Sequence, residues 1–531
     1  MVPSALIASG ATAACPAFSY VPEISARAVS RLVASGALMV GKTNLDQFAS
    51  GLVGVRSPYG VPRNPFDPQF VTGGSSSGSA MAVALGEVSF ALGTDTAGSG
   101  RVPAAFTNIV GLKPSQGVIS TAGVVPACRS LDCVSVFAGT CEDASQVAEL
   151  MRGFDPADAF SRPQADSVRF APEAFPAAFR FGVPPAAERN FRDDAHAAAA
   201  YDDMIGRCAN LGGAPVEIDF RPFREAGAML YDGPFVAERL EAAGRLLAEQ
   251  PDALLPPLRA ILENAKRHDA SSVFAAQLRL RLLRRRIADV WRAIDFLMVP
   301  TAPTLPRIVD VERDPLRLNA ALGMYTNFVN LLDLAAIAIP SGFRADGLPA
   351  GVTLVGPWGS DARLAGFAAR FHRSTSSRIG ATAWSLPSAE SDGGAVPGRG
   401  GSWIPIAVVG AHLTGEPLNH ELTSVGGRLL QAIRTKPRYR LFALPGTTPP
   451  KPGLVRTSDG SGVAIDVEVW ELPPSAFGNF VARIAAPLCI GKLELEDGRS
   501  VSGFLCEAHA TRAARDISAF GGWRAYRRSG T

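Results

Sequence analysis

The sequence predicts an α/β domain, built on a mixed sheet covered by helices, followed by a smaller β-rich domain. Three observations support this fold class. From about residue 24, helix-like and strand-like segments alternate, which is typical of a parallel or mixed sheet covered by helices. Residues 195–295 are rich in Ala, Leu and Arg and predict helices. Beyond residue 402, short apolar segments separated by Pro and Gly predict strands and turns.

The first domain is predicted element by element from its apolar spacing. Residues 24–35 carry apolar side chains at helical spacing, and residues 37–40 predict a short buried strand that ends in a Gly-Lys-Thr-Asn turn. Residues 87–92 predict another short strand, followed by a loop rich in Gly, Thr and Ser. The Arg-rich stretch 278–287 is interpreted as a solvated helix face.

A change in composition marks a domain boundary. Residues 376–401 are poor in large apolar side chains and predict a linker between a domain at 1–375 and a second domain at 402–531. In the second domain, strands are predicted at 404–409, 439–444, 463–470 and 493–495.

Composition limits the functional class. The 531 residues suffice for two or three domains, and the hydrophobic content of 47% argues against global disorder. The net charge of +3 gives no indication of nucleic-acid or anionic-membrane binding. Seven scattered cysteines without a Cys-x-x-Cys pair favour reduced thiols. Without a long apolar window or a signal-peptide pattern, we expect a cytoplasmic protein that does not associate with membranes.

Two Gly/Ser motifs dominate the first domain. Gly-Gly-Ser-Ser-Ser-Gly-Ser occupies residues 73–79, and Gly-Thr-Asp-Thr-Ala-Gly-Ser-Gly-Arg-Val-Pro occupies residues 93–103. Neither motif ends in the Gly-Lys-Ser/Thr of a phosphate-binding loop. Neither has the strand-before, helix-after context of a Gly-x-Ser-x-Gly nucleophile. A Gly/Ser loop without a catalytic role remains the alternative.

The positions of the histidines argue against a Ser-His-Asp triad. All of them lie beyond residue 195, namely His196, His268, His372, His412, His420 and His509. A triad in the first domain would need one of these distant residues, and none lies in a suggestive motif there. A nucleophilic serine in the first domain therefore needs another activator, and a neutral lysine acting through a second serine is the known alternative.

Together with Gly-Lys-Thr-Asn at 41–44, the two motifs resemble the amidase signature. The resemblance implies that Ser99 is the nucleophile and that Ser75, 24 residues earlier and in a cis peptide, relays its proton to a lysine. It also implies an oxyanion hole built from the backbone N–H groups of Thr96, Ala97, Gly98 and Ser99. Small residues suit this task, because several consecutive amides must point at one developing charge.

The lysine that the family uses as a base is missing from its expected place. Counting back from Ser75 by the family spacing leads to Met1, whereas Lys42 belongs to a different family element. The match to the family begins abruptly at Thr12, in Thr-Ala-Ala-Cys-Pro-Ala-Phe. Either the recorded start differs from the natural sequence, which the abrupt onset favours, or the chain is truncated and inactive.

Two further segments of the first domain indicate a substrate. Residues 120–133 and 323–331 resemble the corresponding parts of allophanate hydrolases within the amidase-signature family. Allophanate is a small anion with a carboxylate and a terminal urea, so its pocket should offer an arginine fork and hydrogen-bonding partners. The candidates are Arg129, Arg317, Tyr325 and Asn327. For each of them, a surface ion pair or a structural hydrogen bond remains an alternative.

The second domain resembles the extra domain of allophanate hydrolases, which is a γ-glutamylcyclotransferase-like β-barrel. The resemblance is carried by Val-Gly-Ala-His-Leu at 409–413, Pro-Leu-Asn-His at 417–420, a Pro-rich segment at 449–456 and Phe-Gly-Gly-Trp at 520–523. It implies that this domain assists decarboxylation of the first product. His412 is the first candidate and His420 the second, with a structural role open for both. Their spacing does not suit a metal site, and we expect no metal.

The resemblance as a whole implies hydrolysis of allophanate to ammonia and carbon dioxide, in urea degradation and nitrogen metabolism. It implies no cofactor, a functional link to a biotin-dependent urea carboxylase, and a homodimer. Two alternatives remain: an amidase acting on a different small amide, and a catalytically inactive protein that keeps the fold.

Overall fold

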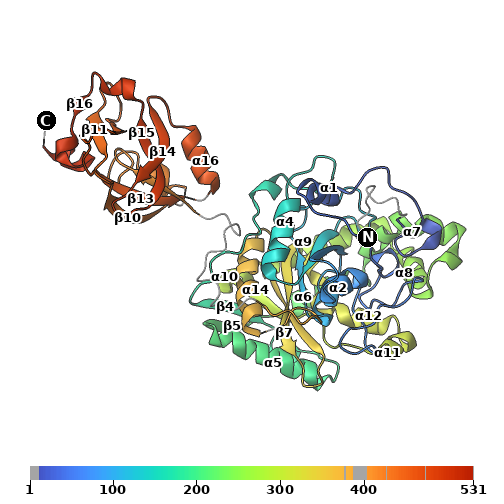
Figure 1. The fold of residues 1–531 in the computed structure, drawn as a ribbon. Coiled ribbons are helices and arrows are strands. Elements are labelled where there is room, and N and C mark those ends of the chain that lie inside the picture. The colour runs from blue at the N-terminus through green and yellow to red at the C-terminus, as the bar shows by residue number, and fades with distance from the viewer. Residues whose placement is uncertain (1–10, 376–377, 387–402, 426, 473, 530–531) are drawn as a thin grey trace. The chain divides into compact units, whose positions relative to one another are not determined.

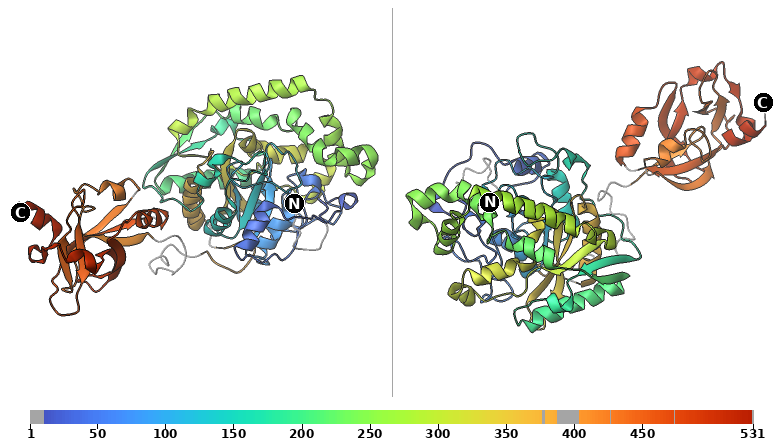
Figure 2. Two further views of the ribbon diagram at one scale, coloured as in Figure 1. Left: turned by 90° about the horizontal axis from the view of Figure 1, so that it is seen from above. Right: turned by 180° about the vertical axis from the view of Figure 1, so that it is seen from behind.

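The computed structural model describes residues 11–375, 378–386, 403–425, 427–472 and 474–529 (Figures 1 and 2). The chain divides into two compact units, Met1–Ser391 and Asp392–Thr531, and each is described by itself.

Unit 1 is built on an eight-stranded mixed sheet with the order β1-β3-β2-β7-β8-β6-β4-β5. Strand β4 pairs in parallel with β5 and β6, and the other neighbours pair antiparallel. This confirms the predicted mixed sheet. The strands are β1 Phe90–Asp95, β2 Val110–Lys113, β3 Cys133–Ala138, β4 Phe179–Val183, β5 Gly213–Glu217, β6 Phe296–Pro300, β7 Leu334–Phe343 and β8 Pro349–Pro357.

Helices cover both faces of this sheet (Figure 1). Alternate residues of β7 belong to different cores, Ala335 and Ile337 to one and Leu334 and Ala336 to the other, as the two-residue period of a strand requires. The first core contains residues of α1 Arg27–Ala34, α4 Cys141–Met151, α5 Ala195–Asn210 and α14 Asp361–Thr375. The second contains residues of α3 Val102–Phe106, α6 Arg221–Ala228, α9 Ala270–Ile287 and α13 Phe328–Leu331.

The remaining helices of unit 1 are α2 Ser77–Ala84, α7 Leu240–Glu249, α8 Pro256–Ala265, α10 Val290–Ala293, α11 Ile308–Arg313 and α12 Arg317–Leu322. The helical prediction for residues 195–295 is confirmed by α5 to α10, except that strand β5 lies within it. The helix predicted at 24–35 corresponds to α1, and the strand predicted at 87–92 to β1, which begins later and extends to Asp95.

The prediction of a strand at residues 37–40 is wrong. This segment has no regular structure, and Leu38 and Val40 are 91% and 79% exposed. A strand needs a neighbour to take its backbone hydrogen bonds, and no described strand pairs with this segment. The segment instead lines a hollow of about 750 Å³ between α1 and β1, at the edge of the sheet where β1 is the last described strand.

Part of the predicted linker packs on unit 1. The Gly380 N–H donates to the Asn108 carbonyl at 3.0 Å, and the Ala381 N–H to the Ala84 carbonyl at 2.8 Å. Residues 378–386 therefore belong to the first unit structurally, beyond the boundary predicted at 375. The rest of the predicted linker lies outside the described residues.

Unit 2 contains a five-stranded sheet, β10-β13-β9-β15-β14, and a three-stranded sheet, β12-β11-β16. The four predicted strands are confirmed as β9, β11, β13 and β14, with shifted ends. The strands are β9 Ile404–Val408, β10 Arg428–Arg434, β11 Tyr439–Ala443, β12 Pro452–Arg456, β13 Asp466–Leu472, β14 Leu488–Glu494, β15 Ser500–Cys506 and β16 Arg515–Asp516. The helices are α15 His420–Thr423, α16 Pro474–Ala482 and α17 Trp523–Arg528.

Each of the seven cysteines is free, and Cys489 is the exposed one. Among the described residues, no helix combines the length and apolarity that crossing a bilayer requires.

Candidate active site

Three segments of unit 1 converge around Ser99. They are the turn after β1, the Gly/Ser loop before α2, and the loop at residues 46–56. The Ser99 hydroxyl donates to the Gly51 carbonyl at 3.4 Å. The Gly74 N–H donates to the Leu52 carbonyl at 2.9 Å. The Asp46 N–H donates to the Ser75 carbonyl at 3.0 Å. Both predicted serines are therefore held against the same loop.

Ser75 is fully buried and follows a cis peptide bond, Gly74–Ser75. Its Oγ has no hydrogen-bond partner within the described part of the chain. Burying a hydroxyl without a hydrogen-bond partner costs free energy of folding. The Ser75 Oγ therefore marks a position where a bound group can supply the missing hydrogen bond.

Two glycines permit the close approach of these segments. A Cβ on Gly74 would lie 2.3 Å from the Asp46 Oδ2 and 2.6 Å from the Gly54 backbone nitrogen. Gly98 has a φ of +139°, and a Cβ there would lie 2.4 Å from the Thr326 Oγ1. Neither position can hold a larger residue without moving the site.

The turn between Asp95 and Arg101 leaves a run of backbone donors available. Over the residues described, no acceptor is found for the backbone N–H groups of Thr96, Ala97, Gly98 and Ser99. These are the groups that the sequence predicts as an oxyanion hole. Buried N–H groups without partners suit the stabilisation of a developing negative charge.

A buried ion pair holds this turn in place. The Arg101 Nε and Nη2 donate to the two carboxylate oxygens of Asp95, each at 2.9 Å, and both side chains are 0% exposed. The same carboxylate accepts the Gly100 N–H at 3.0 Å. The Arg101 Nη2 also donates to the Thr326 carbonyl at 3.2 Å. The turn that carries Ser99 is thereby closed on itself and tied to residues before α13.

Two further polar side chains stabilise the turn. The Asn330 amide donates to the Asp95 carbonyl at 2.7 Å and to the Leu131 carbonyl at 3.0 Å. The Thr96 hydroxyl donates to Asp132 Oδ1 at 2.5 Å. Burial raises the pKa of Asp132, while the hydrogen bond from Thr96 and those from backbone N–H groups act in the opposite direction. Sequence reasoning did not select Asn330 or Asp132, although both lie within the segments that resemble the family.

Sequence reasoning also missed a buried arginine beside the site. Arg239 is 3% exposed, and its guanidinium donates to the Ser50 hydroxyl at 2.8 Å and to the Tyr231 hydroxyl at 3.2 Å. Ser50 adjoins Gly51, whose carbonyl accepts from Ser99. Arg239 forms no ion pair in the described part of the chain. Nothing in the sequence distinguishes this arginine from the many surface arginines of the chain.

The structure does not bring either of the predicted substrate-binding arginines, Arg129 and Arg317, to the serines. Arg129 is about 41% exposed and forms a bidentate ion pair with Glu241 of α7, with distances from 2.5 Å. Arg317 is 79% exposed and pairs with Asp314 at 3.0 Å on the surface. Both arginines thus form the surface ion pairs that the sequence left open as an alternative.

Two predicted substrate-binding residues, Tyr325 and Asn327, are the sequence neighbours of Thr326, which contacts the turn that carries Ser99. The Tyr325 hydroxyl accepts the Asn190 N–H at 2.8 Å, away from the turn. The Asn327 Oδ1 is buried and has no partner among the described residues. Thr326, between them, supplies the side chain that packs on Gly98.

No described lysine is hydrogen-bonded to the two serines. Lys113 is buried, and its ammonium donates to the Pro114 and Leu334 carbonyls at 2.7 and 2.8 Å. Lys42 lines the hollow between α1 and β1, and burial lowers its pKa. Met1, the position that the resemblance assigns to the base, lies outside the described residues.

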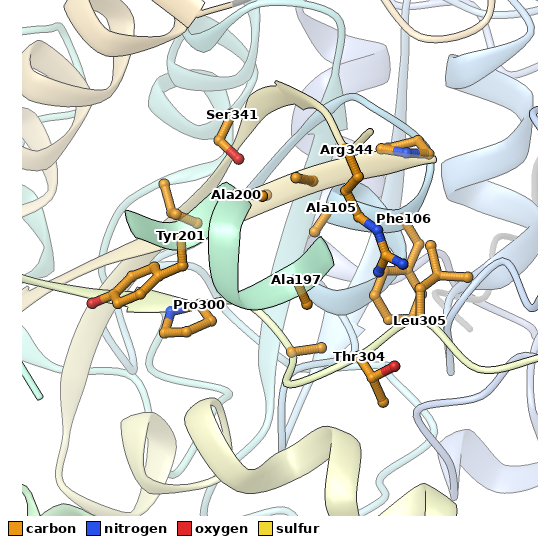
Figure 3. A pocket seen from close by; sticks show the side chains of 15 residues that line it. Ala105, Phe106, Ala197, Ala200, Tyr201, Pro300, Thr304, Leu305, Ser341 and Arg344 are labelled. Carbon is orange, nitrogen blue, oxygen red and sulfur yellow. The ribbon is translucent and has the colours of Figure 1, made fainter. Parts of the chain in front are cut away.

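A second, smaller hollow is lined by residues of α3 and α5 (Figure 3). Its volume of about 40 Å³ holds little more than one water molecule. Arg344, which projects into it, is neutralised by Asp194 at 3.0 Å and by Asp346 at 2.6 Å. This hollow is too small and too well paired to serve as a substrate site.

In unit 2, His412 lies in a largely apolar setting. Its ring stacks on Phe504 at 5.2 Å and contacts the edge of Phe480 at 5.1 Å. Its Nε2 lies 3.1 Å from a Glu421 carboxylate oxygen. Burial lowers the pKa of His412, and the hydrogen bond to Glu421 opposes this. His420 is more exposed, with its Nδ1 2.9 Å from the Pro417 carbonyl. Among the described His, Cys, Asp and Glu residues, no cluster suits a metal ion.

Comparison with known proteins decides the family. The amidase family model matches residues 10–365. The chain belongs to the amidase family. Residues 404–528 match the model of the allophanate hydrolase C-terminal domain. Both serines and the turn after β1 therefore lie within the amidase domain, and His412 lies within the second one.

The chain is similar to two urea amidolyases that are much longer than it is and to one allophanate hydrolase of comparable length. The chain is 41% identical over 528 residues to urea amidolyase of Saccharomyces cerevisiae, covering 97% of this chain and 28% of that protein. It is 40% identical over 529 residues to urea amidolyase of Lachancea kluyveri, covering 98% of this amidase chain and 29% of that protein. The structure of Kluyveromyces lactis allophanate hydrolase is 39% identical, with a TM-score of 0.71, covering 98% of this chain and 86% of that one.

The chain thus spans less than a third of the length of the yeast urea amidolyases that it matches. Together, the family match and the similar structure support the conclusion that this protein is an amidohydrolase.

Proposed function

We propose that this amidase hydrolyses allophanate, releasing ammonia and carbon dioxide. The observation that carries the proposal is the similarity to K. lactis allophanate hydrolase, which extends over 98% of this chain and therefore over both of its domains. An amidase domain alone is shared by enzymes with many substrates, and the second domain narrows the choice.

In the first step, the Ser99 Oγ attacks the terminal amide carbonyl while its proton passes to Ser75. The negative charge that develops on the carbonyl oxygen is stabilised by the N–H groups of Thr96, Ala97, Gly98 and Ser99, which lack other acceptors over the residues described. Ammonia leaves with the returned proton, and a water molecule hydrolyses the acyl-serine to release N-carboxycarbamate.

The substrate carboxylate needs a cation, and Arg239 is the candidate that the geometry favours. Its guanidinium is buried next to Ser50, with hydroxyl groups rather than a carboxylate as partners. The Asp132 carboxylate lies near enough to attract this guanidinium without forming an ion pair with it, and a bound substrate carboxylate would add a charged hydrogen-bond acceptor in a site that excludes water. The unpartnered Asn327 Oδ1 could accept from the substrate's urea nitrogen. Arg129 would have to leave Glu241 in order to take part.

We further propose that full activity needs a lysine at the place assigned to Met1, because Ser75 must pass its proton to a base. In unit 2, His412 would protonate the nitrogen of N-carboxycarbamate as carbon dioxide leaves. The pKa of His412 is lowered, so it would hold a proton only when an anionic product compensates the cost of burial. The enzyme would act in the cytoplasm, on allophanate from a biotin-dependent urea carboxylase.

The test is ammonia release from allophanate by the chain as it stands and by a version in which residues 1–11 are replaced with the family's lysine-containing segment. Ser99→Ala is the control in both. We expect turnover that depends on Ser99 and increases with the lysine. Turnover of other small amides but not of allophanate would favour the alternative amidase. Absence of turnover in both versions, with Ser99 unreactive toward a serine-directed probe, would contradict the proposal.

A further inference from the structure

Arg56 closes the loop at residues 46–56, which holds both serines. It is buried, and its backbone N–H donates to the Asp46 Oδ1 at 2.8 Å, so it joins the two ends of the loop. Its guanidinium reaches back to the middle of the loop, where Nη1 donates to the Ser50 carbonyl at 2.7 Å. The Nη2 donates to the Pro315 carbonyl at 2.5 Å, just before α12. Arg56 thereby ties Ser50 to a fixed part of unit 1.

Ser50 lies between two buried guanidiniums. Its carbonyl accepts from Arg56, and its hydroxyl accepts from the Arg239 Nη1 at 2.8 Å. The two guanidiniums are close enough for their charges to repel each other, and burial strengthens this repulsion because little water screens it. The place of Arg239 therefore depends on Ser50, and the place of Ser50 depends on Arg56.

The part of the loop that contacts the nucleophile is held by other groups. The Leu52 N–H donates to the Oδ1 of the buried Asn319 at 2.7 Å. Leu52 adjoins Gly51, whose carbonyl accepts from the Ser99 hydroxyl. Loss of the guanidinium contacts of Arg56 should therefore displace Ser50 and leave Ser99 in place.

We propose that Arg56 is a positioning residue, which sets the place of the Arg239 guanidinium relative to the Ser99 hydroxyl and so selects amides with a carboxylate one atom away from the amide carbonyl. This proposal rests on the proposed function, because it takes Arg239 as the cation for the substrate carboxylate. In allophanate, a single nitrogen separates the two groups. The contacts to Arg239 and Ser99 fall on consecutive residues of the loop, whose Cα atoms are about 3.8 Å apart, and this short span suits a short anionic amide.

Binding to the full chain in a Ser99→Ala background tests the proposal without turnover. Isothermal titration calorimetry compares malonamate, in which a methylene replaces the bridging nitrogen of allophanate, with succinamate, which is one methylene longer. Arg56→Lys keeps the positive charge but lacks the planar fork that holds two carbonyls. We expect Arg56→Lys to weaken malonamate binding about 10- to 100-fold and succinamate binding less, so that the preference for the shorter anion decreases.

Arg344→Lys is the matched control, because Arg344 is also a buried arginine of unit 1 but forms its ion pairs away from the serines. It should leave both affinities unchanged. Unchanged malonamate binding in Arg56→Lys would overturn the proposal. An equal loss for both anions would also overturn it, because a merely structural role of Arg56 weakens both alike.

Ser50→Ala tests the route from Arg56 to Arg239, and it removes only one hydroxyl if Arg56→Lys does not fold. It should weaken malonamate binding, and adding Arg56→Lys to it should change the affinity little further, because both changes act on the same contact. Additive losses, or a Ser50→Ala variant that binds malonamate normally, would overturn the proposal.

The two proposals can be told apart. No binding of malonamate to Ser99→Ala would contradict Arg239 as the carboxylate site, on which the proposed function and the role of Arg56 both depend. Binding that is insensitive to the Arg56 and Ser50 variants would overturn the role of Arg56 alone.

Discussion

Breaking the buried ion pair between Arg101 and Asp95 should destabilise unit 1 strongly. In Arg101→Met, the Asp95 carboxylate keeps the Gly100 N–H but loses two hydrogen bonds of 2.9 Å from the guanidinium, in a place with no access to water. Removing one partner of a fully buried pair costs about 3–5 kcal/mol, mostly because the other charge stays buried. With a urea dependence of about 3 kcal/mol per molar, the unfolding midpoint should fall by roughly 1–2 M.

The assay is urea unfolding followed by far-ultraviolet circular dichroism, with Glu241→Gln as the control. That variant breaks the half-exposed pair between Arg129 and Glu241, which is worth at most about 1 kcal/mol in solvent. The double variant Asp95→Asn, Arg101→Met should recover part of the loss, because it leaves no charge without a partner. A shift in Arg101→Met no larger than that in Glu241→Gln would refute the reasoning.

Two further perturbations probe the site and its scaffold. Asp132→Ala should lower kcat about 10- to 100-fold with KM changed little, because the Thr96 hydroxyl loses its acceptor and the Thr96 backbone N–H is then no longer held in place, while substrate contacts remain. Steady-state kinetics with Glu241→Gln as control test this, and an effect confined to KM would contradict it. Burial lowers the pKa of His372 to about 4, so the folded state binds fewer protons than the unfolded state between pH 6.5 and pH 4. The free energy of unfolding of unit 1 should therefore be unaffected by His372 above pH 6.5 and should fall by about 3 kcal/mol as the pH falls to 4. In His372→Leu the urea midpoint should decrease less over that pH range. If the midpoints of the variant and the wild type decrease in parallel with pH, this explanation is excluded.

The parts of the site that sequence reasoning could predict are those encoded by local pattern. Ser75 and Ser99 lie in motifs whose glycines are required by contacts within a few ångströms, so the residue types themselves carry the information. Arg239 could not be found in this way, because its place beside the site depends on a hydrogen bond to Ser50, which is 189 residues away in the chain. The same holds for Asn330, which reaches Asp95 across 235 residues.

The fold shows the same division. The strand predicted at 87–92 corresponds to β1, which pairs with β3, whereas the longest strand of unit 1, β7, was not predicted. Residues 37–40 have the composition of a buried strand, yet they remain irregular because no described strand offers them hydrogen bonds. Composition gives the tendency to form a strand, and pairing decides whether the strand forms.

Three buried carboxylates share one structural role around Ser99. Asp46 accepts the Gly54 and Arg56 N–H groups, Asp95 accepts the Gly100 N–H, and Asp132 accepts the Ala127 and Cys128 N–H groups. Each carboxylate therefore binds the backbone of a loop that touches the site.

This use of carboxylates follows from the chemistry of the site. An oxyanion hole made of backbone N–H groups needs small residues, and small residues give a loop few side-chain contacts with which to keep its shape. Buried carboxylates supply the missing rigidity because each accepts several N–H groups at once. Their cost is desolvation, which Arg101 and Arg56 offset by supplying nearby positive charge. The acidic residues near Ser99 are thus best explained as the scaffold of the proposed oxyanion hole, and in the proposed mechanism proton transfer is left to the two serines and a lysine.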